Sequence, residues 1–447
     1  MNDAIPSEHA IAGFSDCLNE QAVLAACRAQ LAQVDASVRL GWASARRIEA
    51  LYHPGRYLRV AYVLLPAGDI EANRYWPEGQ LIYLQAPLRA PLSRRGTRLE
   101  LGSADVEAYV FPNDRRLRGM RKFAGRDTTA KTWAQWSEKT GDGRIVPETL
   151  QRLLVRYVPE QKWIIRLRAE FEPEGGGPPI KRRLAVRCAR AAMHAVLRQR
   201  HDALNAIESN TEASFCVPKI IGSVDANTVL AVEWIRGSSL VKALEAGDAN
   251  EVLGGVARRL ANLHRIDVPD LPPLLSDGLA EGARLACEDL AAAEPKWKAE
   301  LQGLERVLCS ALSKIEVAEP VTLHNDLHLG QIACKRERVI LFDLERMASG
   351  DAMRDVATMA TQIRLCGPRP DFEVSVDTAE QWSRLFLDAW SSVSGASPER
   401  HKLAVYSALA ALELGRGMMR HLRRDWVSIA RSCITFALEQ CASKDTE

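Results

Sequence analysis

Two short apolar segments, each ending near an aspartate, constrain this chain more than any other feature of its sequence. Val321–Leu323 leads into Asp326, and Val339–Phe342 ends at Asp343. If these segments are neighbouring strands, the loops that follow them bring the two carboxylates together, and clustered carboxylates are what a hard divalent cation requires. Phosphoryl transfer needs a positioned hydroxyl group and neutralised phosphates, and it leaves the protein little covalent chemistry to do. The residue types in this stretch match those needs.

The predicted elements divide the chain into a β-rich half and an α-rich half. In residues 48–65 and 153–171, β-branched and aromatic residues alternate with charged ones around a proline-containing turn, which predicts hairpins. Beyond Arg236 the apolar spacing becomes almost wholly helical. We therefore expect a five-stranded antiparallel sheet with one helix to end near Arg236. After Ser239 we expect helices, apart from short strands beside the two aspartate loops.

This order is typical of an α+β fold with a β-rich N-lobe and a helical C-lobe. The expected segments are a helical segment at 1–35, an α+β cap at 36–149, the N-lobe at 150–236 and the C-lobe at 237–447. Shorter signals predict a strand beginning at Val106, a helix at 191–208, and strands at 215–221 and 229–235.

The cap and the N-lobe contain similar hairpin sequences. EALYHPGRYLRVAYVLL and LVRYVPEQKWIIRLRAEF align on Tyr52-x-Pro54 and Tyr157-x-Pro159, an offset of 157 − 52 = 105 residues. Two interpretations stay open. Either residues 36–115 are an internal duplicate of residues 145–235, or the chain contains two unrelated hairpins.

Charge and hydropathy limit the classes of partner. The chain has 59 basic and 57 acidic side chains, a net charge of +2, which gives no field strong enough to predict a nucleic-acid partner. No segment approaches the roughly 18 uncharged apolar residues of a membrane span, and the first residues lack a signal-peptide pattern. Ten scattered cysteines form no C-x-x-C pair. We expect a cytoplasmic protein with neither a nucleic-acid nor a membrane partner, and the oligomeric state stays open.

Three motifs resemble those of the aminoglycoside phosphotransferases and choline kinases, which have a protein-kinase-like fold. The stretch His324-Asn325-Asp326-Leu327-His328-Leu329-Gly330-Gln331 resembles their H-G-D-x-H-x-x-N catalytic loop. It is followed at the usual distance by Phe342-Asp343-Leu344-Glu345, similar to I-D-F-E, and then by Arg354-Asp355-Val356-Ala357, similar to R-D-x-A. Glutamine replaces the usual asparagine at the end of the loop, and H-L-G-Q there is similar to the maltokinase branch.

The resemblance implies a role for each residue of the loop. Asp326 would accept or orient the hydroxyl proton of the acceptor, and His324 would brace the loop. Gln331 and Asp343 would hold Mg²⁺, and Asp355 would support the loop. His328 could equally brace the loop or touch substrate, and Glu345 could serve the metal shell or a surface ion pair. The implied cofactors are ATP and Mg²⁺.

The half that would hold the nucleotide follows the family pattern less closely. The stretch from Leu230 to Leu240 resembles the segment that joins the two lobes, so backbone groups of Glu233, Trp234 and Ile235 would meet the adenine. The strand lysine that grips phosphates is replaced by Arg187, which binds phosphate with a different geometry. The following helix offers only Asp202 or Glu208 as an acidic partner, and the turn at residues 159–161 has no glycine.

These features leave two hypotheses for function. The first is an ATP- and Mg²⁺-dependent kinase of a small hydroxylated molecule, most plausibly a sugar. The second is a pseudokinase, a nucleotide-binding regulatory or scaffold protein with a degenerate ATP site, which Arg187 and the missing glutamate favour. The near-neutral composition gives no support to an enzyme that modifies polycationic antibiotics.

Overall fold

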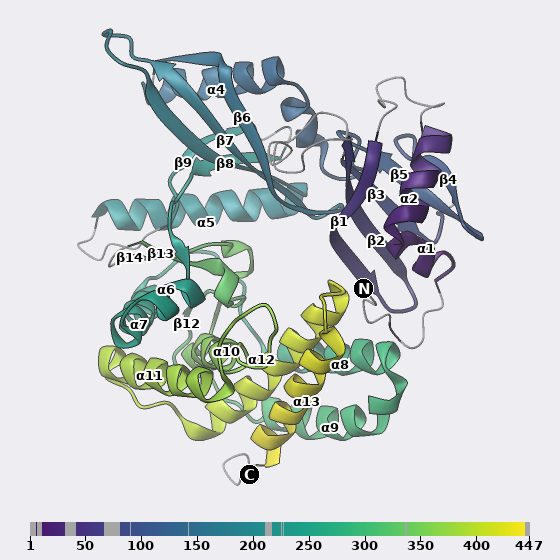
Figure 1. Ribbon diagram of the computed structural model, residues 1–447. Helices are drawn as coiled ribbons and strands as arrows, with labels where there is room; N and C mark the ends of the chain where they lie inside the picture. Colours follow the sequence, from purple (N-terminus) through teal and green to yellow (C-terminus); the bar gives the residue numbers. More distant parts are fainter. Residues whose placement is uncertain are drawn as a thin grey trace. The chain divides into compact units, whose positions relative to one another are not determined.

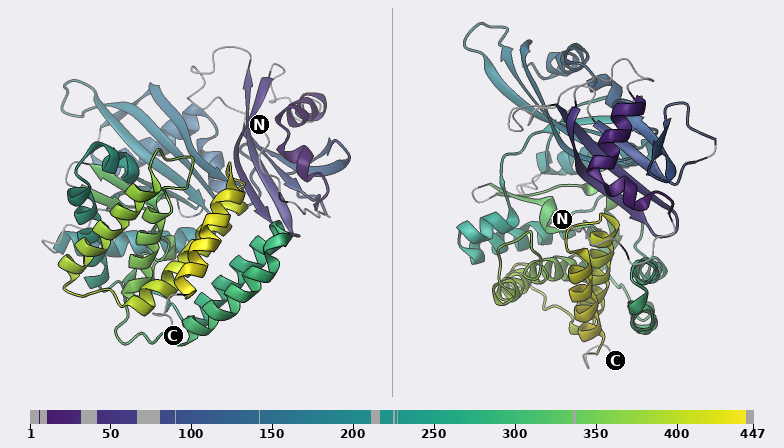
Figure 2. Two further views of the ribbon diagram at one scale, coloured as in Figure 1. Left: turned by 60° about the horizontal axis from the view of Figure 1, so that its bottom comes forward. Right: turned by 45° about the vertical axis from the view of Figure 1, so that its right-hand side comes forward.

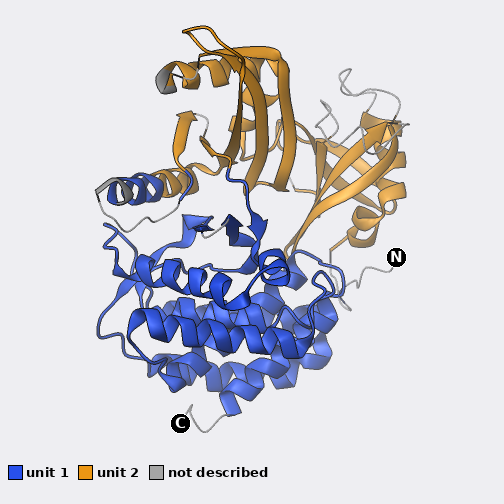
Figure 3. Cartoon of the chain, turned by 60° about the vertical axis from the view of Figure 1, so that its left-hand side comes forward, with its two compact units in different colours: residues 1–8, 199–218, 235–447 blue, residues 9–198, 219–234 orange. Residues whose placement is uncertain are grey.

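The computed structural model describes residues 6, 11–31, 42–66, 81–89, 91–141, 143–210, 217–224, 226, 228–335 and 338–442. The chain forms two compact units (Figure 3). Unit 1 comprises residues 1–8, 199–218 and 235–447, and unit 2 comprises residues 9–198 and 219–234.

Unit 2 contains two five-stranded antiparallel sheets. The first has the strand order β1-β2-β3-β5-β4, and its strands are β1 (Trp42–His53), β2 (Tyr57–Pro66), β3 (Leu81–Ala86), β4 (Thr97–Leu101) and β5 (Ala104–Val110). The second has the order β6-β7-β8-β10-β9, and its strands are β6 (Arg144–Val158), β7 (Lys162–Glu172), β8 (Ile180–Ala189), β9 (Ile220–Val224) and β10 (Val229–Glu233). The second sheet confirms the predicted five-stranded antiparallel sheet that ends near Arg236.

The two sheets have equivalent strand orders and begin with equivalent hairpins (Figure 1). The first strands end at His53 and Val158, and the second strands begin at Tyr57 and Lys162, so that both offsets (158 − 53 and 162 − 57) equal 105 residues. The sheets also differ, because helix α5 (Ala191–Asn210) precedes β9, whereas the described residues between β3 and β4 form no helix. The equivalent strand orders support the duplication hypothesis. The residue-by-residue superposition of the two sheets stays a prediction.

Alternation of side chains explains how the second sheet packs. Along β7, Trp163, Ile165, Leu167, Ala169 and Phe171 are buried, and the residues between them are partly exposed. Residues i and i + 2 of a strand share one face, so one face of the sheet is apolar and the other is polar.

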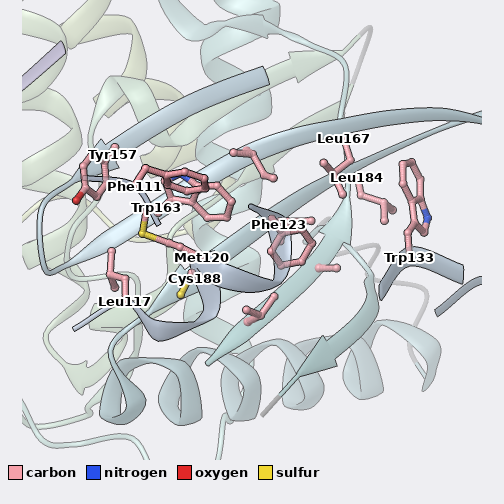
Figure 4. Close-up of a cluster of buried hydrophobic side chains, with 14 of the residues drawn as sticks. Phe111, Leu117, Met120, Phe123, Trp133, Tyr157, Trp163, Leu167, Leu184 and Cys188 are labelled. Carbon is pink, nitrogen blue, oxygen red and sulfur yellow. The ribbon is translucent and has the colours of Figure 1, made fainter. Parts of the chain in front are cut away.

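The apolar face is covered by a 3₁₀ helix, η3 (Arg118–Phe123), and by helix α4 (Arg126–Thr140). In Figure 4, Phe111, Met120, Phe123 and Trp163 point toward one another within this core. The ring of Trp133 meets that of Phe171 edge to face, with centroids 5.1 Å apart. The sequence interpretation did not anticipate α4, whose polar sequence shows little apolar periodicity.

Short helices cover the first sheet: α1 (Phe14–Leu18), α2 (Glu20–Ala26) and a π-helical turn, η1 (Cys27–Leu31). Figures 1 and 2 show α1 and α2 lying along this sheet. The ring of Phe14 packs edge to face on Tyr52 at 5.1 Å, and the Tyr62 hydroxyl donates to the Cys17 carbonyl at 2.5 Å. These elements account for the described part of the predicted helical segment at 1–35, of which residues 1–5, 7–10 and 32–35 lie outside the described residues.

Unit 1 is predominantly helical, as predicted. Its helices are α6 (Leu240–Ala246), α7 (Ala249–Arg265), α8 (Ser276–Ala293), η5 (Pro295–Trp297), α9 (Lys298–Ser313), α10 (Ala352–Arg364), α11 (Val376–Ser394), α12 (Arg400–Arg420) and α13 (Trp426–Ala442). Helix α10 is buried along nearly its whole length between α11 and α12, and α8 pairs with α9. No helix among the described residues is both long enough and apolar enough to cross a bilayer.

The strands of unit 1 are short. Strand β12 (Val321–Leu323) pairs antiparallel with β15 (Ala348–Gly350), and the hairpin of β13 (Ile332–Lys335) and β14 (Arg338–Leu341) pairs with β11 (Ser238–Ser239). Within the described part of unit 1, these are the strands beside the aspartate loops, in agreement with the prediction.

Some predicted boundaries differ from the structure. The strand expected at 215–221 is β9, which begins at Ile220, and residues 215 and 216 lie outside the described residues. The strand expected at 229–235 ends at Glu233, where pairing with β8 stops. The predicted division between residues 149 and 150 falls inside β6, and the assignment of domains stays a prediction.

Candidate functional site

The aspartate loops of unit 1 are joined by main-chain hydrogen bonds. Asp326 follows β12, and a 3₁₀ turn, η6 (Leu329–Gln331), ends the loop. The N–H of Phe342, at the end of β14, donates to the carbonyl of Gln331 at 2.9 Å. The residue before Asp343 is therefore bound to the residue that ends the Asp326 loop.

Asp355, in the first turn of α10, clasps the backbone of the Asp326 loop. Its carboxylate oxygens accept the N–H groups of His324 at 2.7 Å and Asn325 at 2.8 Å. Asn325 has a left-handed backbone, with φ of 58°, a conformation in which asparagine is enriched. The structure thus places Asp355 where the family resemblance implied support of the loop.

His264, at the C-terminal end of α7, is a further partner of Asp355. Its Nε2 lies 3.4 Å from Asp355 Oδ2, and both side chains are buried. Burial by itself raises the pKa of Asp355, but the hydrogen bond and charge of His264 and the nearby His324 lower that pKa overall. The sequence contains no indication of this contact, because a histidine that ends an apolar helix pattern carries no local sign of a distant carboxylate.

The ring of His324 braces the same loop from within. His324 is fully buried, and its Nε2 lies 2.8 Å from the carbonyl oxygen of Phe342. A carbonyl oxygen can only accept, so Nε2 bears the hydrogen and the ring holds β14 against the loop. This contact agrees with the bracing role implied for His324.

The two amide atoms of Gln331 have different environments. Its Nε2 donates to Asp326 Oδ2 at 3.2 Å, while its Oε1 is buried and accepts no hydrogen bond from the described residues. A buried acceptor without a donor is costly, and an amide oxygen is a ligand that Mg²⁺ accepts. The arrangement of Gln331 therefore fits the predicted ligand role.

Asp343 completes the set of predicted metal ligands. It also has a left-handed backbone, with φ of 65°, and its side chain is partly buried. No group of three or more His, Cys, Asp or Glu side chains within the described ranges could hold a metal ion. Mg²⁺ usually retains waters and substrate phosphates and needs only one or two carboxylates, so the lack of such a group does not conflict with the predicted ligands Gln331 and Asp343.

The carboxylate of Asp326 faces a mixed environment. Its side chain is 38% exposed, and Arg346 Nη1 lies 3.8 Å from its other oxygen, Oδ1. Nδ1 of His328 accepts the N–H of Gly330 at 3.1 Å, so His328 makes at least one bracing contact. Glu345 is partly buried, which leaves both of its suggested roles open.

Arg187, the predicted phosphate-binding residue of unit 2, lies on the polar face of the second sheet. It pairs with Ile164 of β7, and alternation places it on the same face as Arg183. Arg168, which pairs with Arg183, and Arg166 share this face. Of the predicted acidic partners, Asp202 is exposed on α5, and the side chain of Glu208 lies outside the described residues.

The segment expected to meet the adenine has some of its backbone donors occupied. The N–H of Glu233 donates to the backbone carbonyl of Lys219 at 2.9 Å, and that of Trp234 donates to the backbone carbonyl of Arg183 at 3.4 Å. The Trp234 ring lies under the guanidinium of Arg166, at 5.3 Å from the ring centroid. The contact of this segment with adenine stays a prediction.

Comparison with known proteins gives one family and several similar folds. The sequence model described as the phosphotransferase enzyme family matches residues 160–395, more than half of the chain. A search of curated proteins returns no match.

Among solved structures, the chain is similar to a choline kinase from Cryptosporidium parvum Iowa II (TM-score 0.48, 16% identity, covering 69% of this chain and 94% of that one). It is also similar to an aminoglycoside phosphotransferase, a thermostable mutant of APH(4)-Ia (TM-score 0.46, 16% identity, covering 69% of this chain and 98% of that one). A third similar structure is an ethanolamine kinase from Plasmodium vivax (TM-score 0.43, 12% identity, covering 65% of this chain and 83% of that one).

Proposed function

Since the chain belongs to the phosphotransferase enzyme family, we propose that it transfers the γ-phosphoryl group of ATP to a hydroxyl group of a small molecule. The observation that supports this most directly is the pairing of Asp326 with Gln331. One carboxylate oxygen of Asp326 is held by the Gln331 amide nitrogen, and the amide oxygen of Gln331 is a buried acceptor without a donor in the described part of the chain. Proton acceptance and metal ligation thus fall to adjacent groups of one clasped loop.

In the proposed reaction the side chain of Asp326 orients the acceptor hydroxyl and takes its proton. The hydroxyl oxygen forms the new bond to the γ-phosphorus, the bond from that phosphorus to the β,γ-bridging oxygen breaks, and ADP leaves. Gln331 keeps one Asp326 oxygen in place, while Asp355 and His324 keep the loop in shape. Pre-set orientation of this kind lowers the barrier without new covalent chemistry.

Gln331 and Asp343 are the residues that would hold Mg²⁺. When bound, a divalent cation neutralises the charge of the phosphates during transfer. The nucleotide would also meet Arg187 in unit 2 and backbone groups of Glu233, Trp234 and Ile235, as the family resemblance implies. We place this reaction in the cytoplasm, and the nine described cysteines, all of which are free thiols, agree with a reducing compartment.

We propose a sugar as the acceptor. The H-L-G-Q end of the loop, similar to the maltokinase branch, supports this assignment. The Arg346 guanidinium beside Asp326 gives separate support, because a cation at that place repels a polycationic acceptor and tolerates a neutral polyol.

The different tasks of the two aspartates provide a test of the proposal. Asp326→Asn should reduce turnover by about 10² to 10⁴, the range for loss of an acid-base group, with nucleotide binding nearly intact. Asp343→Asn should instead weaken Mg²⁺-dependent nucleotide binding. Phosphoryl transfer to a panel of sugars, amino alcohols and aminoglycosides, together with ATP titration calorimetry, measures both. Asp371→Asn, at an exposed aspartate that pairs with Arg369, is the matched control. Wild-type protein that binds no nucleotide and transfers no phosphate would contradict the proposal.

Arg187 separates an active kinase from a pseudokinase. If Arg187 grips nucleotide phosphates, Arg187→Ala should raise the apparent KM for ATP by about tenfold or more, the value of one charge-assisted hydrogen bond. Arg187→Lys should keep or improve activity. Arg168→Ala, on the same face of the sheet, is the matched control, and its KM should change much less. Nucleotide binding without turnover in every variant and in the wild type would favour the pseudokinase.

A further inference from the structure

The turn between β6 and β7 places an acidic side chain where a glycine would be expected. Glu160 has φ of 60°, and Gly55, at the equivalent place in the β1–β2 turn, has φ of 64°. The offset, 160 − 55 = 105 residues, is that of the two hairpins. Left-handed backbone costs a residue with a Cβ on the order of 1 kcal/mol, so Glu160 needs local support. Its side chain is also only 1% exposed.

Four arginines surround the Glu160 carboxylate, and we call them the arginine cluster. The distances from their nitrogens to the Glu160 oxygens are 3.1 Å for Arg59, 3.8 Å for Arg89, 3.1 Å for Arg115 and 3.2 Å for Arg116. None of the four is ion-paired with another described carboxylate. The cluster therefore has four positive charges that share one negative charge.

Asp114 holds the cluster in place without pairing with its guanidinium groups. Its Oδ2 accepts the N–H of Glu160 at 3.0 Å and the hydroxyl of Tyr157 at 2.8 Å. Its Oδ1 accepts the N–H groups of Arg116 at 2.7 Å and Leu117 at 2.9 Å. The backbone that bears two of the arginines is thus fixed to the turn that bears Glu160, so the cluster is preorganised.

Further arginines increase the positive charge at this place. Arg95 donates to the carbonyl of Asp114 at 3.3 Å. Burial lowers the pKa of Arg95, and the charges of Arg121 and Arg118 lower it further. Even with both Glu160 and Asp114 ionised, the four clustered arginines leave an excess of two positive charges.

An excess of fixed guanidinium groups is suited to a phosphate anion. Guanidinium groups bind phosphate oxygens in bidentate fashion, and these hydrogen bonds are stronger than those between neutral groups. Three members can be reached from solvent, since the side chains of Arg89, Arg115 and Arg116 are 31%, 29% and 48% exposed. The side chain of Arg59 is only 7% exposed, and it pairs with Glu160 from within the protein.

We propose that Arg89, Arg115 and Arg116 form a binding site for a phosphate group, and that Glu160 competes with this phosphate for the arginines. The site goes beyond the proposed phosphoryl transfer, because it uses none of the groups assigned to that reaction. The phosphate could belong to a nucleotide or to a phosphorylated small molecule, and both sources present the same chemistry to the arginines.

Titration calorimetry of the full-length protein with inorganic pyrophosphate, without divalent cation, tests the site. Wild-type protein should bind pyrophosphate, and Arg116→Gln should weaken binding by about tenfold, the value of one charge-assisted hydrogen bond. The double variant Arg115→Gln/Arg116→Gln should weaken it further. Arg98→Gln is the matched control, because Arg98 is an exposed arginine of unit 2 that pairs with Asp105, and it should leave binding unchanged. Absence of binding by wild-type protein, or equal binding by all variants, would overturn the proposal.

Glu160→Gln distinguishes a binding site from a structural ion pair. If Glu160 competes with the phosphate, this variant should bind pyrophosphate several-fold more tightly, and pyrophosphate should raise its Tm more than that of the wild type. A purely structural role predicts lower Tm with no gain in affinity, and that result would count against competition. Arg116 is half exposed, so Arg116→Gln keeps the test valid even if Glu160→Gln does not fold.

The source of the phosphate follows from two further titrants. If the phosphate belongs to the nucleotide, Arg116→Gln should weaken ATP and pyrophosphate by the same factor. If it belongs to a phosphorylated small molecule, Arg116→Gln should weaken the binding of glucose 6-phosphate and leave the binding of ATP unchanged.

Asp343→Asn should leave pyrophosphate affinity unchanged, so failure of the arginine site and failure of the proposed catalytic site give different results. A loss of pyrophosphate binding in Asp343→Asn would overturn the site in unit 2.

Discussion

Each compact unit contains a buried aspartate that clasps a left-handed loop. In unit 1, Asp355 accepts the backbone N–H groups of His324 and Asn325. In unit 2, Asp114 accepts the N–H of Glu160, together with those of Arg116 and Leu117. In both places a carboxylate satisfies donors that a loop in this conformation cannot give to a neighbouring strand.

The side chains around the two aspartates differ, and so does the charge state that each site favours. Asp355 faces His264 and His324, which lower its pKa despite complete burial. Asp114 faces the Tyr157 hydroxyl and backbone donors, and burial raises its pKa despite these hydrogen bonds. The two histidines therefore favour the ionised form of Asp355, whereas burial disfavours the ionised form of Asp114.

The largest expected effect is on the free energy of unfolding when each carboxylate becomes an amide. Asp355→Asn should cost about 3–5 kcal/mol, because it removes a buried charge that the histidine partner needs. Asp114→Asn should cost about 1–3 kcal/mol, the range for unsatisfied hydrogen-bond donors alone. Urea denaturation of both variants measures this difference. Equal costs would remove the distinction between the two clasps.

The pH dependence of these costs should have opposite signs. The lowered pKa of Asp355 means that its stabilisation is present above the unfolded pKa, near 3.9, and is lost as pH falls through the folded pKa. The raised pKa of Asp114 means that its contribution is present below the unfolded pKa and is lost as pH rises through the folded pKa. The cost of Asp355→Asn should therefore shrink below about pH 4, and the cost of Asp114→Asn should shrink above it.

Unfolding curves for the wild type and both variants between about pH 3 and 6, a range that spans the unfolded carboxyl pKa, are the measurement. Asp105→Asn, at a partly exposed aspartate of the first sheet, controls for general effects of acid. Parallel curves for the two clasp variants would show that charge plays no part in the comparison.

The smallest expected effect concerns the turn that has no clasp. Gly55→Ala should reduce the free energy of unfolding by about 1 kcal/mol, because the new Cβ meets no atom and only the left-handed backbone is penalised. Gly175→Ala, where the Cβ also meets no atom and φ is not left-handed, is the matched control and should be neutral or slightly stabilising. If Gly55→Ala destabilised the protein no more than Gly175→Ala does, the backbone of the β1–β2 turn would be able to relax.

Much of the Asp326 loop could be predicted from sequence because its contacts are local or belong to a known motif. His324, Asp326, Gln331 and Asp355 lie within one stretch. His324 and Asp355 contact the loop, whereas the hydrogen bond between Gln331 and Asp326 was not predicted, and the roles of Asp326 and Gln331 stay predictions. The β-then-α order was likewise visible, since alternation in residues 153–171 and helical spacing beyond Arg236 are properties of neighbouring residues.

Contacts between distant parts of the chain could not be predicted in this way. His264 meets Asp355 across 91 residues, and Arg59 meets Glu160 across 101 (160 − 59), so no local pattern marks either pair. Helix α4 was missed because its apolar residues are few and its burial depends on Trp133 and Trp136 meeting the second sheet. In such places tertiary packing decides the structure, and propensity gives little indication.

The exchange of glycine for glutamate at one turn also limits how this protein can change by single substitutions. Replacing Glu160 by glycine relieves the backbone but leaves four arginines facing one another. Replacing the arginines first leaves a buried carboxylate without enough partners, on a strained backbone. Either order passes through a less stable protein, so the turn and its arginines are coupled and should be exchanged as a set. Position 55 contacts no ion pair among the described residues, so a substitution there is limited by its backbone conformation alone.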